Sequence, residues 1–531
     1  MNETTQPSKC KRLARRGLIA LAWIVSIIAL CYGVIDWRAR HAWNEYRQNY
    51  EARVAPLDLK AYIPKEIPDA ENFAATPFVL SWIKDWRSTN VLFDHDAWGQ
   101  AHNMIYNPAQ PPAARDFEDL VAWQEAFAAV RSHAQKTKDK FHSDKLDLAS
   151  RAQAATAILE GMKDDEAVFD ELNKASARPY ARYPIVYYME NPWAILLPHL
   201  AKIKQTCLRL ETRACAELAT EQNEKALADV RLALYTADTV RTEPFFVSYM
   251  VRIACVHIAI HPIWEGLAEQ RWTDAQLQQL QAGLESYDFL ADMQLPLHTE
   301  RAWGVLTADL MKKRGLGLLA SFLEEMHLSD THSFWDNEAV LNVLGRILPS
   351  GWYDREKLNY CLLADYQYRG TVDEVSKRVF PSRVAANALK LALVAKANPQ
   401  TPDWGLGSPA QGPLHAIIHH EYLAGILLPS LHNFPRNVAT IKTAADEAAI
   451  ACALERYRLA NGQFPENLRA LVPRFAAHLP NDVITGEPYK YRRTDGGRFV
   501  LYSVGWNEKD DGGVSGKTMF DETAGDWGWT E

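Results

Sequence analysis

The sequence reads ALERYRLANGQFPENLRALVP at residues 453–473 and HLPNDVITGEPYKYRRTDGGRFVLYSVGWNEKDDGG at residues 478–513. These two runs define the architecture of the C-terminal region. The first run predicts the end of a long helix. Asn461 and Gly462 can adopt the positive φ that stops a helix, and Pro465 prevents the helix from resuming.

The elements on either side of this stop follow from local patterns. We expect the long helix to span 437–461, after Pro435, and a short helix to occupy 467–473. Two alternating runs, Tyr489–Arg492 and Arg498–Ser503, are separated by Asp-Gly-Gly. This pattern predicts a β-hairpin, because glycine supplies the backbone freedom that a tight turn requires.

The order of these elements resembles the globular domain of bacterial type II pseudopilins, in particular the major pseudopilin of type II secretion, over about residues 437–531. YRLANGQFP at 457–465 is similar to the family pattern YRLDNGRYP. LPNDVITGEPY at 479–489 resembles LPxDPWGNPY but lacks the proline and tryptophan after the aspartate. FVLYSVG at 499–505 resembles FDIYSLGADG. The resemblance implies a small α+β module with an antiparallel sheet.

The same resemblance implies a calcium ion, because the family binds Ca²⁺ in the loop after this strand. Calcium takes about six to eight oxygen ligands from carboxylates, amides and carbonyls. Residues 503–531 hold seven acids and two bases, so the alternative is a solvated acidic tail. The equivalent ligands here are the carbonyl of Val504 and the side chains of Asn507, Asp510, Asp511 and Asp526.

Two departures limit what the resemblance implies. A pseudopilin carries a prepilin signal with a glutamate five residues after a glycine, but Ala22 stands five residues after Gly17. A pseudopilin also joins its membrane helix directly to the globular domain, whereas about 400 residues intervene here. We therefore expect that this chain does not polymerise into a pseudopilus.

The N-terminus predicts a membrane anchor. The uncharged run Leu18–Ile35 would form a helix about 27 Å long at ~1.5 Å per residue, close to the thickness of the hydrocarbon core. A cleaved signal peptide is the alternative, but its apolar region is shorter and ends in a small-x-small site, which is absent here. Basic residues before the run favour a cytoplasmic N-terminus and a periplasmic bulk. These residues are Lys9, Lys11, Arg12, Arg15 and Arg16.

Charge and cysteine content exclude some partners. The net charge is −8, and residues 1–17 contribute +4 (five bases and Glu3), so the remainder carries −8 − 4 = −12. Nucleic acid is a poor partner for such a chain, because phosphate binding needs a basic face. Five of the seven cysteines follow the anchor, with no CxxC pair. We expect buried free thiols; pairing of Cys207 with Cys215 is the alternative.

The region between the anchor and the C-terminal module has a helical pattern. Val251–Leu267 is almost wholly apolar, and Thr273-Asp-Ala-Gln276 predicts a capping box. We expect about ten helices and no repeats. The expected organisation is a basic tail (1–17), a transmembrane helix (18–35), a stalk and extended approach (36–112), an all-α domain (113–397), a Pro/Gly-rich linker (398–413), and long helices leading into the α+β module (414–531).

The helical region contains histidines but no established catalytic motif. There is no GxSxG elbow, no Walker loop and no dinucleotide fingerprint after a strand. Three pairs have spacing that could suit a metal or proton transfer, but packed histidines are the favoured interpretation. The pairs are His415 with His419, His257 with His261, and His298 with Glu300.

The sequence therefore predicts a mainly α, single-pass protein of a bacterial inner membrane, with an all-α extracytoplasmic domain and a small α+β module. The expected function is structural: a membrane-anchored interaction protein in an envelope or type II secretion-like assembly, with a calcium-binding C-terminal loop. The alternative is a membrane-tethered hydrolase. Convergence of two or more of His257, His261, His298 and Glu300 in one pocket would favour that alternative.

Overall fold

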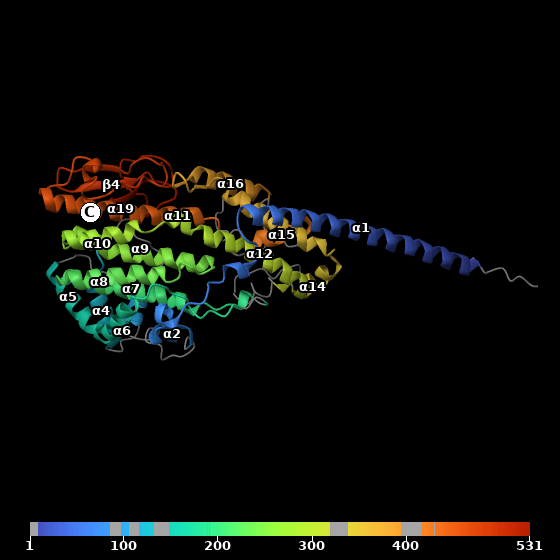
Figure 1. Ribbon diagram of the computed structural model, residues 1–531, viewed down its shortest axis with the longest axis horizontal. Coiled ribbons are helices and arrows are strands. Elements are labelled where there is room, and N and C mark those ends of the chain that lie inside the picture. Colours follow the sequence, from blue (N-terminus) through green and yellow to red (C-terminus); the bar gives the residue numbers. More distant parts are fainter. Residues whose placement is uncertain are drawn as a thin grey trace, which may run out of the picture. The chain divides into compact units, whose positions relative to one another are not determined.

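A computed structural model describes the chain over residues 9–84, 97–105, 116–131, 148–187, 190, 192–318, 338–394, 417–428 and 431–530. The fold is mainly helical, with two small antiparallel sheets (Figure 1). One long apolar helix lies at the N-terminus. These features confirm the predicted helical class and the C-terminal antiparallel sheet.

The chain divides into two compact units, and each unit draws on several of the ranges expected from the sequence. Helices α12 (Gln294–Arg314) and α16 (Pro381–Val394) pass from one unit to the other. Unit 1 comprises Met1–Ala61, Glu300–Gln367 and Asn387–His432, and unit 2 comprises Tyr62–Thr299, Tyr368–Ala386 and Asn433–Glu531.

Unit 1 is built around α1 (Lys9–Arg53), which is one uninterrupted helix (Figure 1). Its first part is exposed, and from Ala39 onward apolar side chains such as Trp43 and Tyr50 are buried. The other described helices of the unit are α14 (Glu338–Ile347), α15 (Gly351–Tyr368) and α18 (Tyr422–Leu427). The first part of the segment expected as a stalk, from residue 36 to Arg53, is thus a continuation of α1.

Two carboxylates of unit 1, half-buried Asp36 and buried Glu356, stabilise helix starts. Asp36 accepts a hydrogen bond from the N–H of Gly351 at 2.5 Å, at the beginning of α15. Glu356 accepts the N–H of Leu423 at 2.5 Å, in the first turn of α18. The first N–H groups of a helix have no partner within the helix, so each contact satisfies one of them.

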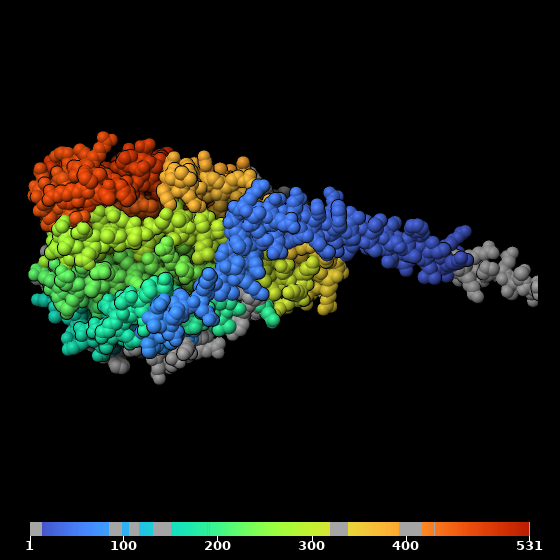
Figure 2. Space-filling view, in the orientation of Figure 1, coloured from blue at the N-terminus to red at the C-terminus, as the bar shows by residue number. Residues whose placement is uncertain are grey.

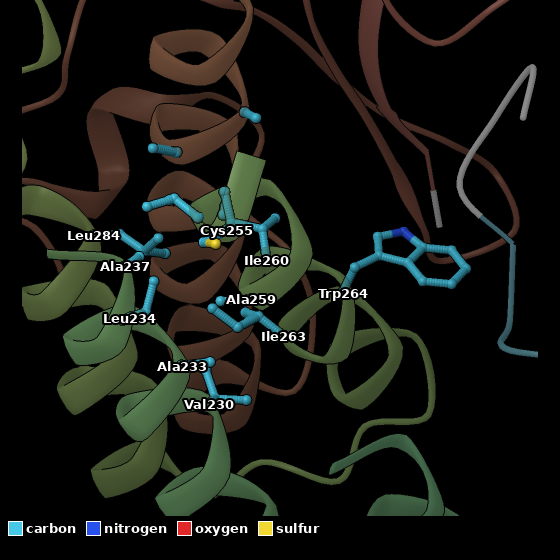
Figure 3. Close-up of a cluster of buried hydrophobic side chains, with 14 of the residues drawn as sticks. Val230, Ala233, Leu234, Ala237, Cys255, Ala259, Ile260, Ile263, Trp264 and Leu284 are labelled. Atoms are coloured by element: carbon cyan, nitrogen blue, oxygen red, sulfur yellow. The ribbon is translucent and has the colours of Figure 1, made fainter. Parts of the chain in front are cut away.

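Unit 2 contains a core of long helices: α7 (Pro198–Ala219), α8 (Asn223–Asp238), α9 (Phe246–Ala268), α10 (Asp274–Glu285) and α19 (Phe434–Asn461). The predicted apolar helix lies within α9, and the capping box of Thr273 and Gln276 begins α10 as expected. Figure 3 shows part of the core, with Val230, Ala233, Leu234 and Ala237 from α8, Cys255, Ala259, Ile260 and Ile263 from α9, and Leu284 from α10.

Shorter elements surround this core. The helices are α2 (Pro77–Lys84), α3 (Ala97–Ile105), α4 (Leu120–Arg131), α5 (Leu148–Gly161), α6 (Glu166–Ala175) and α11 (Phe289–Asp292). The 3₁₀ turns of unit 2 are η2 (Asp69–Glu71), η3 (Phe73–Ala75), η4 (Lys163–Asp165), η5 (Pro192–Ala194) and η8 (Leu468–Leu471), whereas η1 (Leu59–Tyr62) belongs mostly to unit 1. A two-stranded hairpin, β1 (Val372–Asp373) with β2 (Arg378–Val379), adds a small sheet inside the range expected to be all-α.

The C-terminal module matches the predicted order of elements. Helix α19 ends at Gly462, whose φ of 77° is left-handed, and η8 follows. The hairpin of β3 (Lys490–Arg493) and β4 (Phe499–Ser503) is confirmed, and β5 (Trp527–Thr530) adds a third antiparallel strand in the order β3-β4-β5.

One boundary was predicted wrongly. Pro435 was expected to precede the long helix, but α19 begins at Phe434 and Pro435 lies in its first turn. The N–H that proline lacks has no helical partner at this position, so proline starts a helix without loss.

Candidate functional site

The five predicted calcium ligands lie at the end of β4 and in the loop that leads to β5. Asp526 accepts the N–H of Asp511 at 3.1 Å and the N–H of Gly513 at 2.6 Å. Asp511 in turn accepts the side-chain amide of Asn507 at 3.0 Å and the N–H of Gly525 at 3.1 Å. The fold thus brings Asn507, Asp511 and Asp526 together.

The two other predicted ligands have different partners. Asp510 accepts the hydroxyl of Tyr502 at 3.0 Å and lies 3.3 Å from the ammonium of Lys490. The backbone N–H of Val504 donates to Asp482 at 3.4 Å. Asp510 is therefore paired with an exposed lysine rather than with the other predicted ligands.

Two further aspartates organise this region, and the sequence interpretation did not assign them a role. Buried Asp482 accepts hydrogen bonds from the N–H of Ile484 at 2.9 Å and from the hydroxyl of Ser503 at 2.8 Å. Asp521 accepts the N–H of Thr523 at 2.7 Å, and this bond holds the pKa of Asp521 down at about 2. Several aspartates of the loop thus accept hydrogen bonds from backbone N–H groups, as in Asx turns.

A polar cluster that combines half-buried and buried side chains lies in the helical part of unit 2. His261 of α9 donates from Nδ1 to the carboxylate of Glu211 on α7 at 2.9 Å and from Nε2 to the carbonyl of Asp116 at 2.9 Å. Two protons on the imidazole and an ionised Glu211 satisfy both contacts. The geometry thus fits an imidazolium–carboxylate pair.

Electrostatics agree with this geometry. Burial alone would lower the pKa of His261, but the hydrogen bond to Glu211 and the charges of Glu211, Glu265 and Glu118 outweigh it and raise the pKa to about 10. Burial raises the pKa of Glu211 to about 7, against the opposing effect of His261. The pair is consequently held as ions over a range above neutral pH.

Glu265, one turn after His261, extends the cluster to α5. Arg151 donates to Glu265 at 2.5 Å and to Glu269 at 2.6 Å. The other Glu265 oxygen accepts the N–H of Glu118 at 2.5 Å. This network joins α5, α7, α9 and the segment before α4.

The cluster has the donor types of a transition-metal site. The donor atoms of Cys215, His261 and Glu265 lie within 4.8 Å of one another. Sulfur, imidazole and carboxylate together would suit zinc rather than calcium. However, the nitrogens of His261 already donate to Glu211 and Asp116, and an ion would have to replace one of these contacts. The geometry favours a structural ion-pair network.

A cleft of about 600 Å³ lies between α5, α6, α7 and α8. On its wall, Arg213 of α7 makes a two-pronged contact with Asp229 of α8, with Nε to Oδ2 at 2.5 Å. Glu217 lies one turn further along α7, 4.0 Å from Arg213. Its Oε2 is buried and has no hydrogen-bond partner among the residues described. The three ionisable side chains thus lie close together on the wall of the cleft.

The pKa of Glu217 is strongly raised in this cleft. Burial, followed by the charge of Asp229, raises the pKa of Glu217 to about 9. Burial also raises the pKa of Asp229, and its contact with Arg213 opposes that rise. Two carboxyls with one guanidinium between them can therefore hold a proton at neutral pH, which is the arrangement of a general acid.

The histidine and glutamate residues singled out from the sequence do not form one site in the part of the chain that the structure describes. His257 lies one turn before His261 on α9, but its ring contacts Phe520, with 5.5 Å between ring centroids. His298 and Glu300 lie on α12, and Glu300 belongs to unit 1. His415 falls outside the described residues.

The cysteines described beyond α1 are buried and free. Cys207 and Cys215 both lie on α7 without a disulfide, so the alternative of a bond between them is not borne out. Comparison of the chain with protein-family models, curated proteins and solved structures finds no match.

Proposed function

We propose that this chain is a membrane-anchored, extracytoplasmic structural or interaction protein of a bacterial envelope or type II secretion-like assembly. The observation that carries the proposal is the continuity of α1. Every residue of its apolar part, Leu18–Ile35, is exposed, and the same helix becomes part of the unit 1 core only a few residues later. Figure 2 presents this part of α1 as a surface that no other segment covers in this view.

The contacts of α1 favour a permanent anchor over a cleaved signal. Tyr46 donates to Asp365 of α15 at 2.7 Å, and the ammonium of Lys357 lies 5.0 Å from the ring centre of Trp43. A side chain at Gly351 would meet the backbone of Asp36 at 2.6 Å, so α1 and α15 approach as closely as glycine permits. Cleavage near the end of the apolar run would detach or expose these contacts.

The C-terminal module supports an assembly role through its resemblance to pseudopilins. Helix α19 is buried along Phe434–Glu455 and packs against α9 and α10 within the chain. The faces that a pseudopilin helix would offer to other subunits are therefore used internally. We accordingly place the chain beside such an assembly rather than in its polymer, with Ca²⁺ held by Val504, Asn507, Asp510, Asp511 and Asp526.

The test is the state of the full chain in membranes. We expect it to resist extraction by alkaline carbonate, to keep its N-terminal residues by intact mass, and to sediment after mild solubilisation as a complex larger than its 60.1 kDa plus detergent. A chain that is released by carbonate, or shortened after the apolar run, contradicts the anchor. A chain that sediments alone contradicts the interaction role.

The Glu217 cleft favours a second function, a membrane-tethered hydrolase. Glu217 would donate a proton to a leaving group, while Arg213 and Asp229 would bind and orient a polar substrate. Chromogenic esters, phosphate esters and glycosides would be offered to the full chain, its E217Q variant and its E160Q variant. Glu160 lines the same cleft but is exposed, which makes it the matched control. Turnover that survives E217Q, or no turnover of any class, contradicts this function.

A further inference from the structure

Helix α14 presents an apolar face that is not packed against the described residues of unit 1. Val343 and Ile347 are 60% and 59% exposed and lie one turn apart, and exposed Ala339 precedes them by another turn. Of the ten residues of α14, Leu341 is the one that is buried. Such a face, on a helix of only ten residues, needs a cover other than water.

The polar residues of α14 form a separate ridge. Glu338, Asn342 and Arg346 follow one another at four-residue spacing. Asn342 donates to Glu338 at 3.3 Å and accepts the N–H of Gly317 at 2.9 Å. The helix is therefore amphipathic, with one ridge tied to polar neighbours and one ridge apolar.

The position of α14 along α1 indicates what covers this face. The hydroxyl of Tyr32 donates to the carbonyl of Ile347 at 2.5 Å. Asp36 holds the N–H of Gly351, four residues after the end of α14. Tyr32 lies inside the apolar run Leu18–Ile35, so the end of α14 is fixed to the last turn of the anchor.

The lengths make this contact informative. An apolar run of about 27 Å nearly equals a hydrocarbon core of about 30 Å, and the headgroup layer adds roughly 5–7 Å on each side. Tyr32 is three residues from the end of the run, or about 4.5 Å along the helix. The end of α14 therefore lies at the boundary between acyl chains and headgroups. Trp37, exposed in the next turn of α1, is a residue type enriched at this depth.

We propose that α14 lies in the membrane interface beside the anchor, with Ala339, Val343 and Ile347 turned to lipid and Arg346 to lipid phosphate. The inference rests on the anchor proposed above. It assigns to unit 1 a second contact with the bilayer, which would fix the rotation and tilt of α1 and hold unit 1 against the membrane surface. The occupant of the apolar face is thus a lipid surface.

The experiment measures depth with a fluorophore on single cysteines in full-length chains reconstituted into phosphatidylcholine–phosphatidylglycerol vesicles. The background carries C10S and C31S, because the other cysteines are buried. The probed sites are V343C, L21C inside the anchor, and L362C as the matched control. Leu362 is a 45% exposed leucine of the same unit, eleven residues or about 17 Å along α15 from Gly351.

Nitroxide-bearing lipids report contact with the bilayer. The proposal predicts strong quenching at L21C, clear quenching at V343C with shallow nitroxides, and little at L362C. Quenching at L21C with V343C no better quenched than L362C would overturn the proposal and leave the anchor intact. A V343C probe shielded from water but not quenched would mean that protein covers the face, which also overturns it. Absence of quenching at L21C would contradict the proposed membrane anchor itself.

Discussion

Glu217 gives the most quantitative prediction, because burial strongly raises the pKa of its carboxyl group. Replacing it with glutamine keeps the shape and removes the titration. A carboxyl whose pKa rises from 4.5 to about 9 on folding stays protonated at pH 7 in the folded chain but ionises on unfolding. At ~1.4 kcal/mol per pH unit, this favours the unfolded state by about 3 kcal/mol at pH 7.

The sign of the pH dependence follows from the same shift. The stability that Glu217 contributes is complete below pH 4.5 and is lost as the pH rises towards 9. E217Q should therefore be similar to wild type near pH 4.5 and more stable by up to about 3 kcal/mol at pH 7. The gap should widen until about pH 9.

Urea unfolding of the full chain in detergent, at several pH values, measures this difference. E160Q is the control, because the Glu160 side chain is 71% exposed and surface substitutions usually change stability by less than about 0.5 kcal/mol. A wild type that is as stable as E217Q at pH 8, or more stable, would refute the assignment of a buried neutral acid. Such a result would mean that Glu217 is ionised and compensated by Arg213.

Three further predictions follow from the other sites. Calcium at about 100 times its Kd should raise the unfolding free energy by about 2.7 kcal/mol, and an Asp511→Ala/Asp526→Ala variant should lose that rise. Thermal denaturation with and without calcium measures the difference; equal rises in both proteins would show that the ion does not bind in this loop. His261→Gln should destabilise the chain by about 1–3 kcal/mol near neutral pH, since it leaves half-buried Glu211 without its partner. Because the pKa of His261 is raised from 6.5 to about 10, the difference should shrink as the pH rises above 6.5 and be lost near pH 10; a pH-independent difference would contradict the ion pair. Asp482→Ala should lower the free energy of unfolding by about 2–4 kcal/mol, and Asp482→Asn by less, because several backbone and hydroxyl donors depend on this carboxylate. Urea unfolding measures this change; an Asp482→Ala variant as stable as the wild type would show that these donors find other partners.

The parts of the fold that the sequence predicted correctly depend on neighbouring residues. Gly462 ends α19 because glycine can adopt a left-handed conformation. The capping box at the start of α10 joins Thr273 and Gln276, which are three positions apart. The β3–β4 hairpin closes through a short turn. Strand β5 was missed because its four residues form a strand only by pairing with β4, from which a loop of more than twenty residues separates them.

The candidate sites depend on contacts that no local pattern contains. Arg213 and Asp229 lie on different helices, and Glu118 and Glu265 are separated by 147 positions. The sequence shows that the loop is acidic. It does not show which carboxylates accept backbone N–H groups and which cluster together, because that depends on how the loop folds. His261 was noted for its spacing to His257, whereas its partner is Glu211 on another helix.

The most direct test of the account is the side of the membrane on which the folded chain lies. Val375 is 96% exposed, and a V375C variant offers a thiol at the tip of the β1–β2 hairpin. A membrane-impermeant maleimide is applied to intact spheroplasts, and Cys10 in the basic tail serves as the internal control. The account predicts labelling at residue 375 in intact spheroplasts and at Cys10 only after lysis. Labelling of Cys10 before lysis, with residue 375 protected, would contradict it.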